Sequence, residues 1–188
     1  MVYANRTTRK YCAMSRFQIE WPMRFIHSII FVTLAVPLLP AAAEVIGVYR
    51  AWTAVTVSKE KKNTCMMWAQ PNRSRGFKGK RGDVFAFVTH QPSEDRINRV
   101  SFETGYELGA RPNVLARVDD DTFSLNAEGT GAWTRSGEDD LAMIGAMREG
   151  QVMTVESETG DGALIRDRFS LLGFTAAYKA ISAACEVR

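Results

Sequence analysis

Strand-like hydrophobic patterns occupy most of the chain. Residues 84–89 are apolar at successive positions, which is typical of a strand buried on both faces. Residues 100–106 instead alternate between apolar and polar side chains, the pattern of a half-buried strand. Residues 91–98 between them are polar and contain a proline, so we expect a connecting loop there. The two runs therefore predict a pair of antiparallel strands.

Further short runs share this composition, rich in β-branched and aromatic residues. They cover residues 45–58, 64–70, 113–118, 122–125, 132–134, 151–156 and 163–170. Turn-forming residues separate them, including three consecutive aspartates at 119–121 and the Asp-Gly pair within 159–162. The aspartates lack the spaced ligands and closing glutamate of a calcium loop, so we interpret them as a hairpin turn.

Two segments follow a helical period instead. The first is capped by Ser136, carries apolar residues at helical spacing as far as Arg148, and ends at Gly150. The second covers residues 173–184 and has one apolar stripe. Many short strands with two short helices, one of them C-terminal, predict an all-β fold, an antiparallel, immunoglobulin-like β-sandwich. A closed barrel is the alternative architecture.

The N-terminal region has the features of a targeting segment. Residues 25–39 are apolar but shorter than the roughly 20 residues of a membrane-spanning helix. Three alanines end at Ala43, which predicts cleavage by a signal peptidase after Ala43, and we expect translation to begin at Met23. This interpretation makes residues 1–43 a signal peptide region and residues 44–188 a single domain. The alternative is a retained membrane anchor.

Removal of residues 1–43 changes the charge. That region holds five of the 24 basic and one of the 21 acidic side chains, so the remainder has 19 and 20, a net charge of −1. A globally basic nucleic-acid-binding protein is therefore disfavoured, and we expect no nucleic-acid partner.

Two cysteines remain after cleavage, because Cys12 leaves with the signal region. An exported protein meets an oxidising compartment, where a pair of cysteines usually forms a disulfide bond, so we predict a Cys65–Cys185 bridge. The alternative is a redox or metal pair, but the chain has no Cys-x-x-Cys motif and one histidine in this region.

The segment 59–81 is the most one-sided in charge, with eight basic residues and one acidic residue. Its side chains Lys78, Lys80 and Arg81 are candidates for contact with anions or the cell envelope. The alternative is a solvated loop that keeps a sheet edge from aggregating. Arg81-Gly82-Asp83 also matches a tripeptide that integrins recognise, but this match lacks a protruding loop, and we interpret it as a turn.

The chain lacks recognisable catalytic motifs. His90 ends a predicted strand, and we interpret it as a surface residue or a local hydrogen-bonding residue rather than a catalyst. No Gly-x-Ser-x-Gly motif, P-loop or dinucleotide fingerprint occurs, and one histidine with a bridged cysteine pair does not supply a zinc site. We therefore predict no catalytic, cofactor-binding or metal-binding residues and no cofactor. A hydrolase with paired carboxylates is the enzymatic alternative.

Five segments carry a family resemblance. RGDVFAFVTHQP, NRVSFETGYEL, DTFSLNAEGTGAW, LAMIGAMREGQVMTVES and DRFSLLGFTAAYKAISAAC occur in this order between about Trp52 and Cys185. Their order and spacing resemble the invasion-associated locus B family. The resemblance implies an exported β-sandwich protein of a Gram-negative bacterium, with the Cys65–Cys185 pairing. It supplies no catalytic residues, and Arg99 stands where an acidic residue is common in the family.

These inferences combine into one functional expectation. We expect a non-enzymatic protein of the periplasm, outer membrane or secreted fraction that binds a protein or envelope partner. Some members of the family it resembles are linked to host-cell entry, which implies a role in host-cell association. An anionic-lipid-binding module in peripheral contact with the membrane is a further alternative.

Overall fold

The computed structural model describes residues 43–59, 62–110 and 112–187, so the predicted signal region lies outside the described residues except for Ala43, and Cys12 lies outside as well. The described residues form strands, two α-helices and one short 3-10 helix. The strands are β1 (Ala43–Tyr49), β2 (Trp52–Lys59), β3 (Lys62–Ala69), β4 (Arg73–Arg75), β5 (Phe85–Gln91), β6 (Arg96–Glu103), β7 (Val114–Val118), β8 (Asp121–Glu128), β9 (Gly131–Thr134), β10 (Val152–Glu158) and β11 (Leu164–Ser170). The helices are α1 (Gly137–Glu149), α2 (Phe174–Ala184) and the 3-10 helix η1 (Pro92–Glu94).

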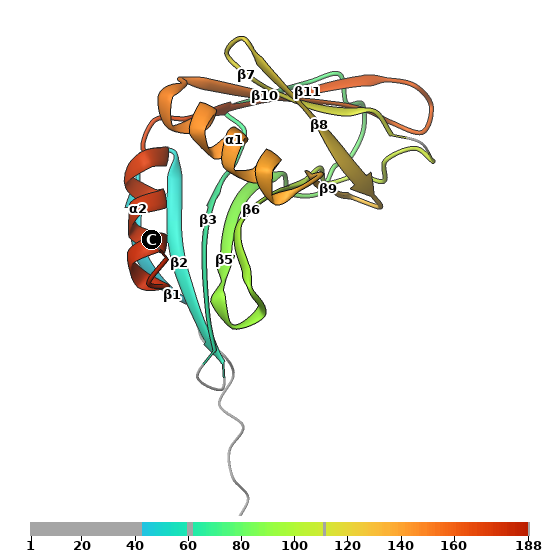
Figure 1. The fold of residues 1–188 in the computed structure, drawn as a ribbon. Coiled ribbons are helices and arrows are strands. Elements are labelled where there is room, and N and C mark those ends of the chain that lie inside the picture. Colours follow the sequence, from blue (N-terminus) through green and yellow to red (C-terminus); the bar gives the residue numbers. More distant parts are fainter. Residues whose placement is uncertain (1–42, 60–61, 111, 188) are drawn as a thin grey trace, which may run out of the picture. The chain divides into compact units, whose positions relative to one another are not determined.

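All eleven strands belong to one antiparallel sheet, in the order β1-β2-β3-β5-β6-β9-β8-β7-β10-β11-β4. The sheet bends, so that β1, β2, β3, β5 and β6 form one layer while β7, β8, β10 and β11 run across its end (Figure 1). Strand β9 joins the two layers by pairing with both β6 and β8. The predicted all-β, sandwich-like class with two helices is confirmed. Strands β1 and β4 are the two ends of the sheet, so its ladder is not closed into a barrel.

Several strand boundaries differ from the prediction, and β6 begins at Arg96, inside the predicted loop 91–98. Strand β6 ends at Glu103 rather than continuing to residue 106, because Gly105 has a φ of +72° and the chain turns out of the sheet there. A side chain at Gly105 would lie 2.5 Å from the carbonyl oxygen of Gly82, so only glycine permits this close approach. The predicted loop 71–82 contains the short edge strand β4, whose three polar residues carry no apolar signal.

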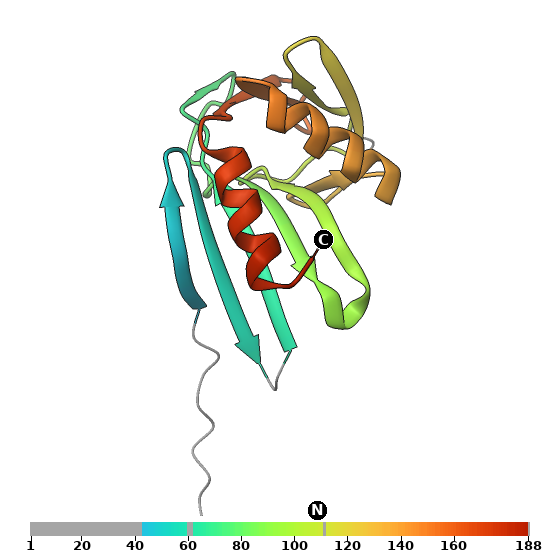
Figure 2. The same ribbon diagram turned by 60° about the vertical axis from the view of Figure 1, so that its left-hand side comes forward.

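Both predicted helices are confirmed. The hydroxyl of Ser136 accepts a hydrogen bond from the backbone N–H of Asp139 at 3.1 Å and caps α1. Met143, Ile144 and Met147 of this helix are buried in the core, as their spacing predicted, whereas Leu141 of the same predicted stripe is 57% exposed. Helix α2 packs against β1, β2 and β3 (Figure 2).

One hydrophobic core connects the two layers of the sheet. The indole N–H of Trp52 in β2 donates to the carbonyl oxygen of Ser170 in β11 at 3.0 Å. The Trp52 ring meets the Phe174 ring edge-on, with centroids 5.0 Å apart. Phe102 of β6 and Phe169 of β11 lie 6.4 Å apart in the same core. These contacts join segments more than 60 residues apart in sequence, which makes the strands and α2 one packed unit.

Candidate functional site

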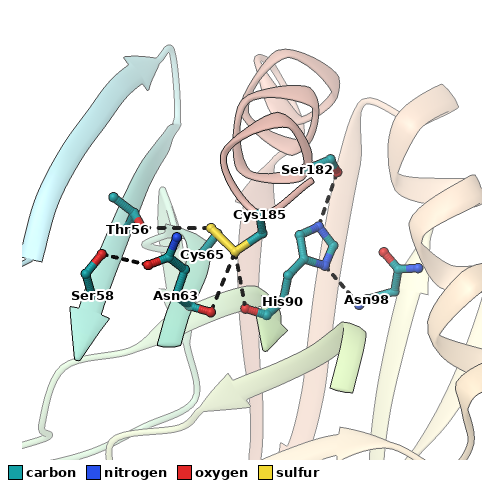
Figure 3. Close-up of a disulfide and its surroundings, with 8 residues drawn as sticks. All are labelled: Thr56, Ser58, Asn63, Cys65, His90, Asn98, Ser182 and Cys185. Atoms are coloured by element: carbon teal, nitrogen blue, oxygen red, sulfur yellow. Dashed lines mark hydrogen bonds between the residues drawn. A yellow bond between two sulfur atoms is a disulfide. The ribbon is translucent and has the colours of Figure 1, made fainter. Parts of the chain in front are cut away.

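The cysteine pair lies where α2 ends against β3. The Sγ atoms of Cys65 and Cys185 are 2.03 Å apart and the Cα atoms 5.9 Å apart, which is disulfide geometry (Figure 3). Both residues are buried, and they are 120 positions apart in sequence. The chain-entropy account gives about 4–5 kcal/mol of stabilisation for closing a loop of this length. The bridge ties the last helix to the sheet layer that carries β3.

His90 lies beside this bridge, because it is the direct cross-strand partner of Cys65. It is fully buried, so the surface interpretation was wrong and the hydrogen-bonding interpretation was right. Its Nδ1 accepts from the backbone N–H of Asn98 at 3.0 Å, so Nε2 carries the proton and donates to the Ser182 hydroxyl at 3.2 Å (Figure 3).

The surroundings of His90 favour its neutral form. Burial lowers the pKa of His90 to about 4. Its hydrogen-bond partners among the described residues are a backbone amide and a hydroxyl, with no carboxylate to orient it as a triad would require. The arrangement therefore holds α2 and the β5–β6 hairpin together rather than activating a nucleophile.

The three candidate anion-binding residues separate into two groups. Lys78 and Lys80 are exposed, as a contact surface requires. The Arg81 guanidinium is bound inside the fold, with Nη1 and Nη2 2.8 and 2.5 Å from the two carboxylate oxygens of Asp167 in β11. The exposed fractions of these two side chains are 11% and 2%. The prediction that Arg81 contacts an external anion is therefore wrong, because its charge is already paired with a buried carboxylate.

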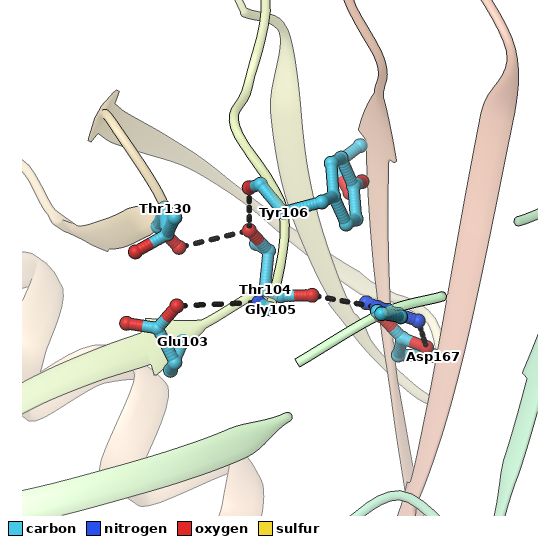
Figure 4. A network of polar contacts seen from close by, with 8 residues as sticks. Glu103, Thr104, Gly105, Tyr106, Thr130 and Asp167 are labelled. Carbon is cyan, nitrogen blue, oxygen red and sulfur yellow. Dashed lines mark hydrogen bonds and ion pairs between the residues drawn. The ribbon is translucent and has the colours of Figure 1, made fainter. Parts of the chain in front are cut away.

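Arg81 is the centre of a buried network, of which Figure 4 labels Thr104, Tyr106 and Asp167. Its Nε donates to the carbonyl oxygen of Thr104 at 2.6 Å, and its guanidinium lies 5.0 Å from the centre of the Tyr106 ring. The Tyr106 hydroxyl is 2.6 Å from the hydroxyl of Ser157 in β10. The network thus fastens the segment before β5 to β10 and β11. Because Arg81 is paired inside the fold, the arginine of Arg81-Gly82-Asp83 is not available to an external receptor such as an integrin.

A pocket of about 360 Å³ lies next to this network. Its lining includes the Phe77 and Tyr106 rings, Lys78 and two acidic residues, Glu107 and Asp161. The pKa of the Asp161 carboxyl is lowered, chiefly by the hydrogen bond from the Thr159 hydroxyl. A general acid needs a raised pKa, so Asp161 does not fit the role of the acid in a paired-carboxylate hydrolase.

Asp140 is a buried acidic residue that the sequence interpretation missed. It lies in the first turn of α1 and is fully buried. Its Oδ1 accepts from the backbone N–H of Val100 at 2.8 Å and from the Thr134 hydroxyl. Arg99 places its Nε 3.6 Å from Oδ2, so this arginine has a charge partner within the chain. The available signal was helical spacing, because residues 140, 143, 144 and 147 share one face.

The part of the chain that the structure describes lacks a metal-ion site and a membrane-spanning helix. No group of three or more His, Cys, Asp or Glu side chains there is arranged to hold a metal ion. None of the helices within residues 43–187 is long and apolar enough to span a bilayer.

The comparisons with known proteins agree on one family. The family model described as "Invasion associated locus B (IalB) protein" matches residues 52–182. The crystal structure of invasion associated protein B from Bartonella henselae superposes with a TM-score of 0.53 at 15% sequence identity, covering 78% of this chain and 98% of that chain. At this identity, the structural likeness shows a shared fold. No curated protein matches the chain significantly. Because the family model covers more than half of its residues, the chain belongs to the invasion associated locus B family.

Proposed function

We propose that this protein is exported to the bacterial envelope, loses its signal peptide near Ala43, and acts there by binding a partner rather than by catalysis. The observation that carries the proposal is the buried Cys65–Cys185 bridge, a bond that forms and persists in an oxidising compartment. Family membership supports it, since this is not a known enzyme family. The family name makes host-cell association the setting in which such binding would act.

Fractionation of a Gram-negative host that expresses the full chain tests export. We expect the protein in the periplasmic or outer-membrane fraction, with Glu44 as its first residue by mass spectrometry. Thiol alkylation without reductant should leave Cys65 and Cys185 unmodified in that fraction. The matched control lacks residues 23–43 and should stay in the cytosol. Recovery of the intact chain in the cytosol would refute the proposal.

Crosslinking in intact cells tests partner binding. The exposed Lys78 and Lys80 supply amine groups, and Lys78 lines the pocket beside Tyr106. We expect the envelope form to give a discrete crosslinked band that disappears when the envelope is solubilised before crosslinking. A band pattern identical to that of the cytosolic control would contradict binding in the envelope.

A further inference from the structure

Five arginines share one exposed face of the sheet, which we call the arginine face: Arg73, Arg75, Arg117, Arg166 and Arg168. The side chains of β11 alternate, so that Ile165, Asp167 and Phe169 are buried while Arg166 and Arg168 point outward. The edge strand β4 and the strand β7 extend this outward row on either side.

The strand register places these arginines next to one another. Arg73 is the direct partner of Arg168, and Arg75 is the direct partner of Arg166. On the other side of β11, Thr154 of β10 pairs with both Arg168 and Arg117. Directly paired side chains lie about 5 Å apart. Four of the guanidinium groups therefore lie side by side on β4 and β11, and that of Arg117 on β7 is separated from Arg168 by Thr154.

The acidic side chains on this face do not neutralise it. Glu156 is bound by two arginines, 3.2 Å from Arg117 Nε and 2.8 Å from Arg166 Nε. These contacts lower the pKa of Glu156, chiefly through the hydrogen bond from Arg166. Glu158 stands at the far end of β10, opposite Leu164, and Asp119 lines the same hollow as Arg117 and Arg166. Within the described residues, Arg73, Arg75 and Arg168 take part in no ion pair.

This arrangement has a physical cost that an external anion would remove. Like charges directly opposite each other across two strands destabilise a sheet, and here two such pairs are adjacent. Protection of a sheet edge against aggregation needs charges on the edge strand alone. The arginines continue onto β11 and β7, which lie inside the sheet, so edge protection does not account for them.

We propose that the arginine face binds the phosphate groups of anionic phospholipids at a membrane surface. All five residues are arginine, whose planar guanidinium donates two parallel hydrogen bonds to a phosphate. A sheet face presents these groups as a planar array, as a layer of headgroups requires. Leu164 continues the outward row beside Arg166, is 42% exposed, and adds an apolar contact at the rim. This inference rests on the proposed export, which brings the protein to a membrane surface.

Other anionic partners fit the face less well. Single-stranded nucleic acid binds where aromatic side chains alternate with basic ones, but the outward residues between the arginines are Thr154 and Glu156. The basic segment 59–81 contributes Arg73 and Arg75 to the face through β4, whereas Lys78 and Lys80 follow that strand. The face, rather than the loop as a whole, is therefore the expected contact.

Vesicle co-sedimentation of the processed protein tests the proposal. We expect binding to vesicles of phosphatidylglycerol with phosphatidylcholine, little binding to phosphatidylcholine alone, and weakening at high salt. The double variant Arg73→Gln/Arg168→Gln should bind about 30-fold less, since each basic side chain near an anionic surface contributes about 1 kcal/mol. The matched control Lys78→Gln/Lys80→Gln removes the same charge outside the face and should bind nearly as well as the parent protein. Thermal unfolding of each variant verifies that it folds.

Several outcomes would overturn the inference. The protein could bind both kinds of vesicle equally or bind neither, the control variant could lose as much binding as the double variant, or a single-stranded oligonucleotide could bind saturably in preference to vesicles. Competition by inorganic phosphate at the concentration of the vesicle phosphate would likewise assign the face to free phosphate instead. Fractionation distinguishes failure of this inference from failure of the proposed function. A protein that is exported and processed but does not bind vesicles refutes only the membrane contact.

Discussion

Buried polar residues satisfy backbone and charge requirements inside the fold. Asp140 accepts from the backbone N–H of Val100, His90 accepts from that of Asn98, and Asp167 pairs with Arg81. Asn98 has a φ of +62°, so its amide lies where the β5–β6 ladder is disturbed and needs a side-chain acceptor. Each of these polar residues is therefore fixed in place by its partner.

The Arg81–Asp167 pair gives the first prediction. Arg81→Ala should lower the free energy of unfolding by about 3–5 kcal/mol, because Asp167 would keep its charge in a buried site without a partner. Urea denaturation measures this change. The control Arg96→Ala removes an exposed pair with Glu94 and should cost about 1 kcal/mol or less. Equal losses in the two variants would contradict the role given to Arg81.

His90 gives a prediction for pH. Its pKa is about 4 in the folded protein, below the value of 6.5 for an unperturbed histidine. The unfolded chain therefore binds a proton first, so the stability held above pH 6.5 is lost as the pH falls toward 4, by about 3 kcal/mol in total. Urea denaturation of the parent protein and His90→Gln across this range measures the difference. If the variant shows the same pH dependence as the parent, His90 is not the group responsible.

Helix α2 is attached to the sheet at both of its ends. Gly173 precedes the helix with a φ of +92°, and Cys185 follows it in the disulfide bond. A side chain at Gly173 would lie 1.9 Å from the carbonyl oxygen of Tyr49, so the connection from β11 passes directly against the end of β1. The position of α2 over β1–β3 thus depends on this glycine as well as on the bridge.

Glycine substitutions test this attachment. Gly173→Ala should destabilise the protein by roughly 2 kcal/mol or more, because the left-handed backbone and the contact with Tyr49 both oppose a side chain. Gly145→Ala is the matched control, since that glycine lies within α1 and a methyl group there meets no atom within 4 Å. It should stabilise the protein by about 0.5–1 kcal/mol. Chemical denaturation of both variants would contradict this account if the two changes had the same sign.

At the scale of the whole described domain, the two sheet layers share one core. The pair Phe102–Phe169 and the hydrogen bond from Trp52 to Ser170 cross from one layer to the other. A shared core predicts that the layers unfold together, because neither buries its inner face without the other.

Phe169→Ala tests this coupling. The variant should lose about 3–5 kcal/mol and still unfold in one transition, with tryptophan fluorescence and far-ultraviolet circular dichroism changing together. Leu172→Ala, at a side chain that is 65% exposed, should be nearly neutral. Two separate transitions in the Phe169→Ala variant would show that the layers are independent.

Local patterns in the sequence determined the elements and the family. The alternation that begins at Val100, the cap at Ser136 and the Asp161-Gly162 turn depend on neighbours within a few positions, so they can be predicted from the sequence alone. The ordered motifs between Trp52 and Cys185 were enough for the family, and the count of cysteines was enough for their pairing. Strand β4 was missed because its three residues are polar and exposed.

Only the tertiary structure decided which charges are internal and which face outward. Arg81 looked like one more basic residue of a loop until Asp167, 86 positions away, was placed beside it. The arginine face brings together Arg73, Arg117 and Arg168, which are too far apart in the sequence for a local pattern to relate them. Strand pairing brings distant segments within about 5 Å of each other, and the partner across the sheet, rather than the neighbour along the chain, determines what a charged side chain does.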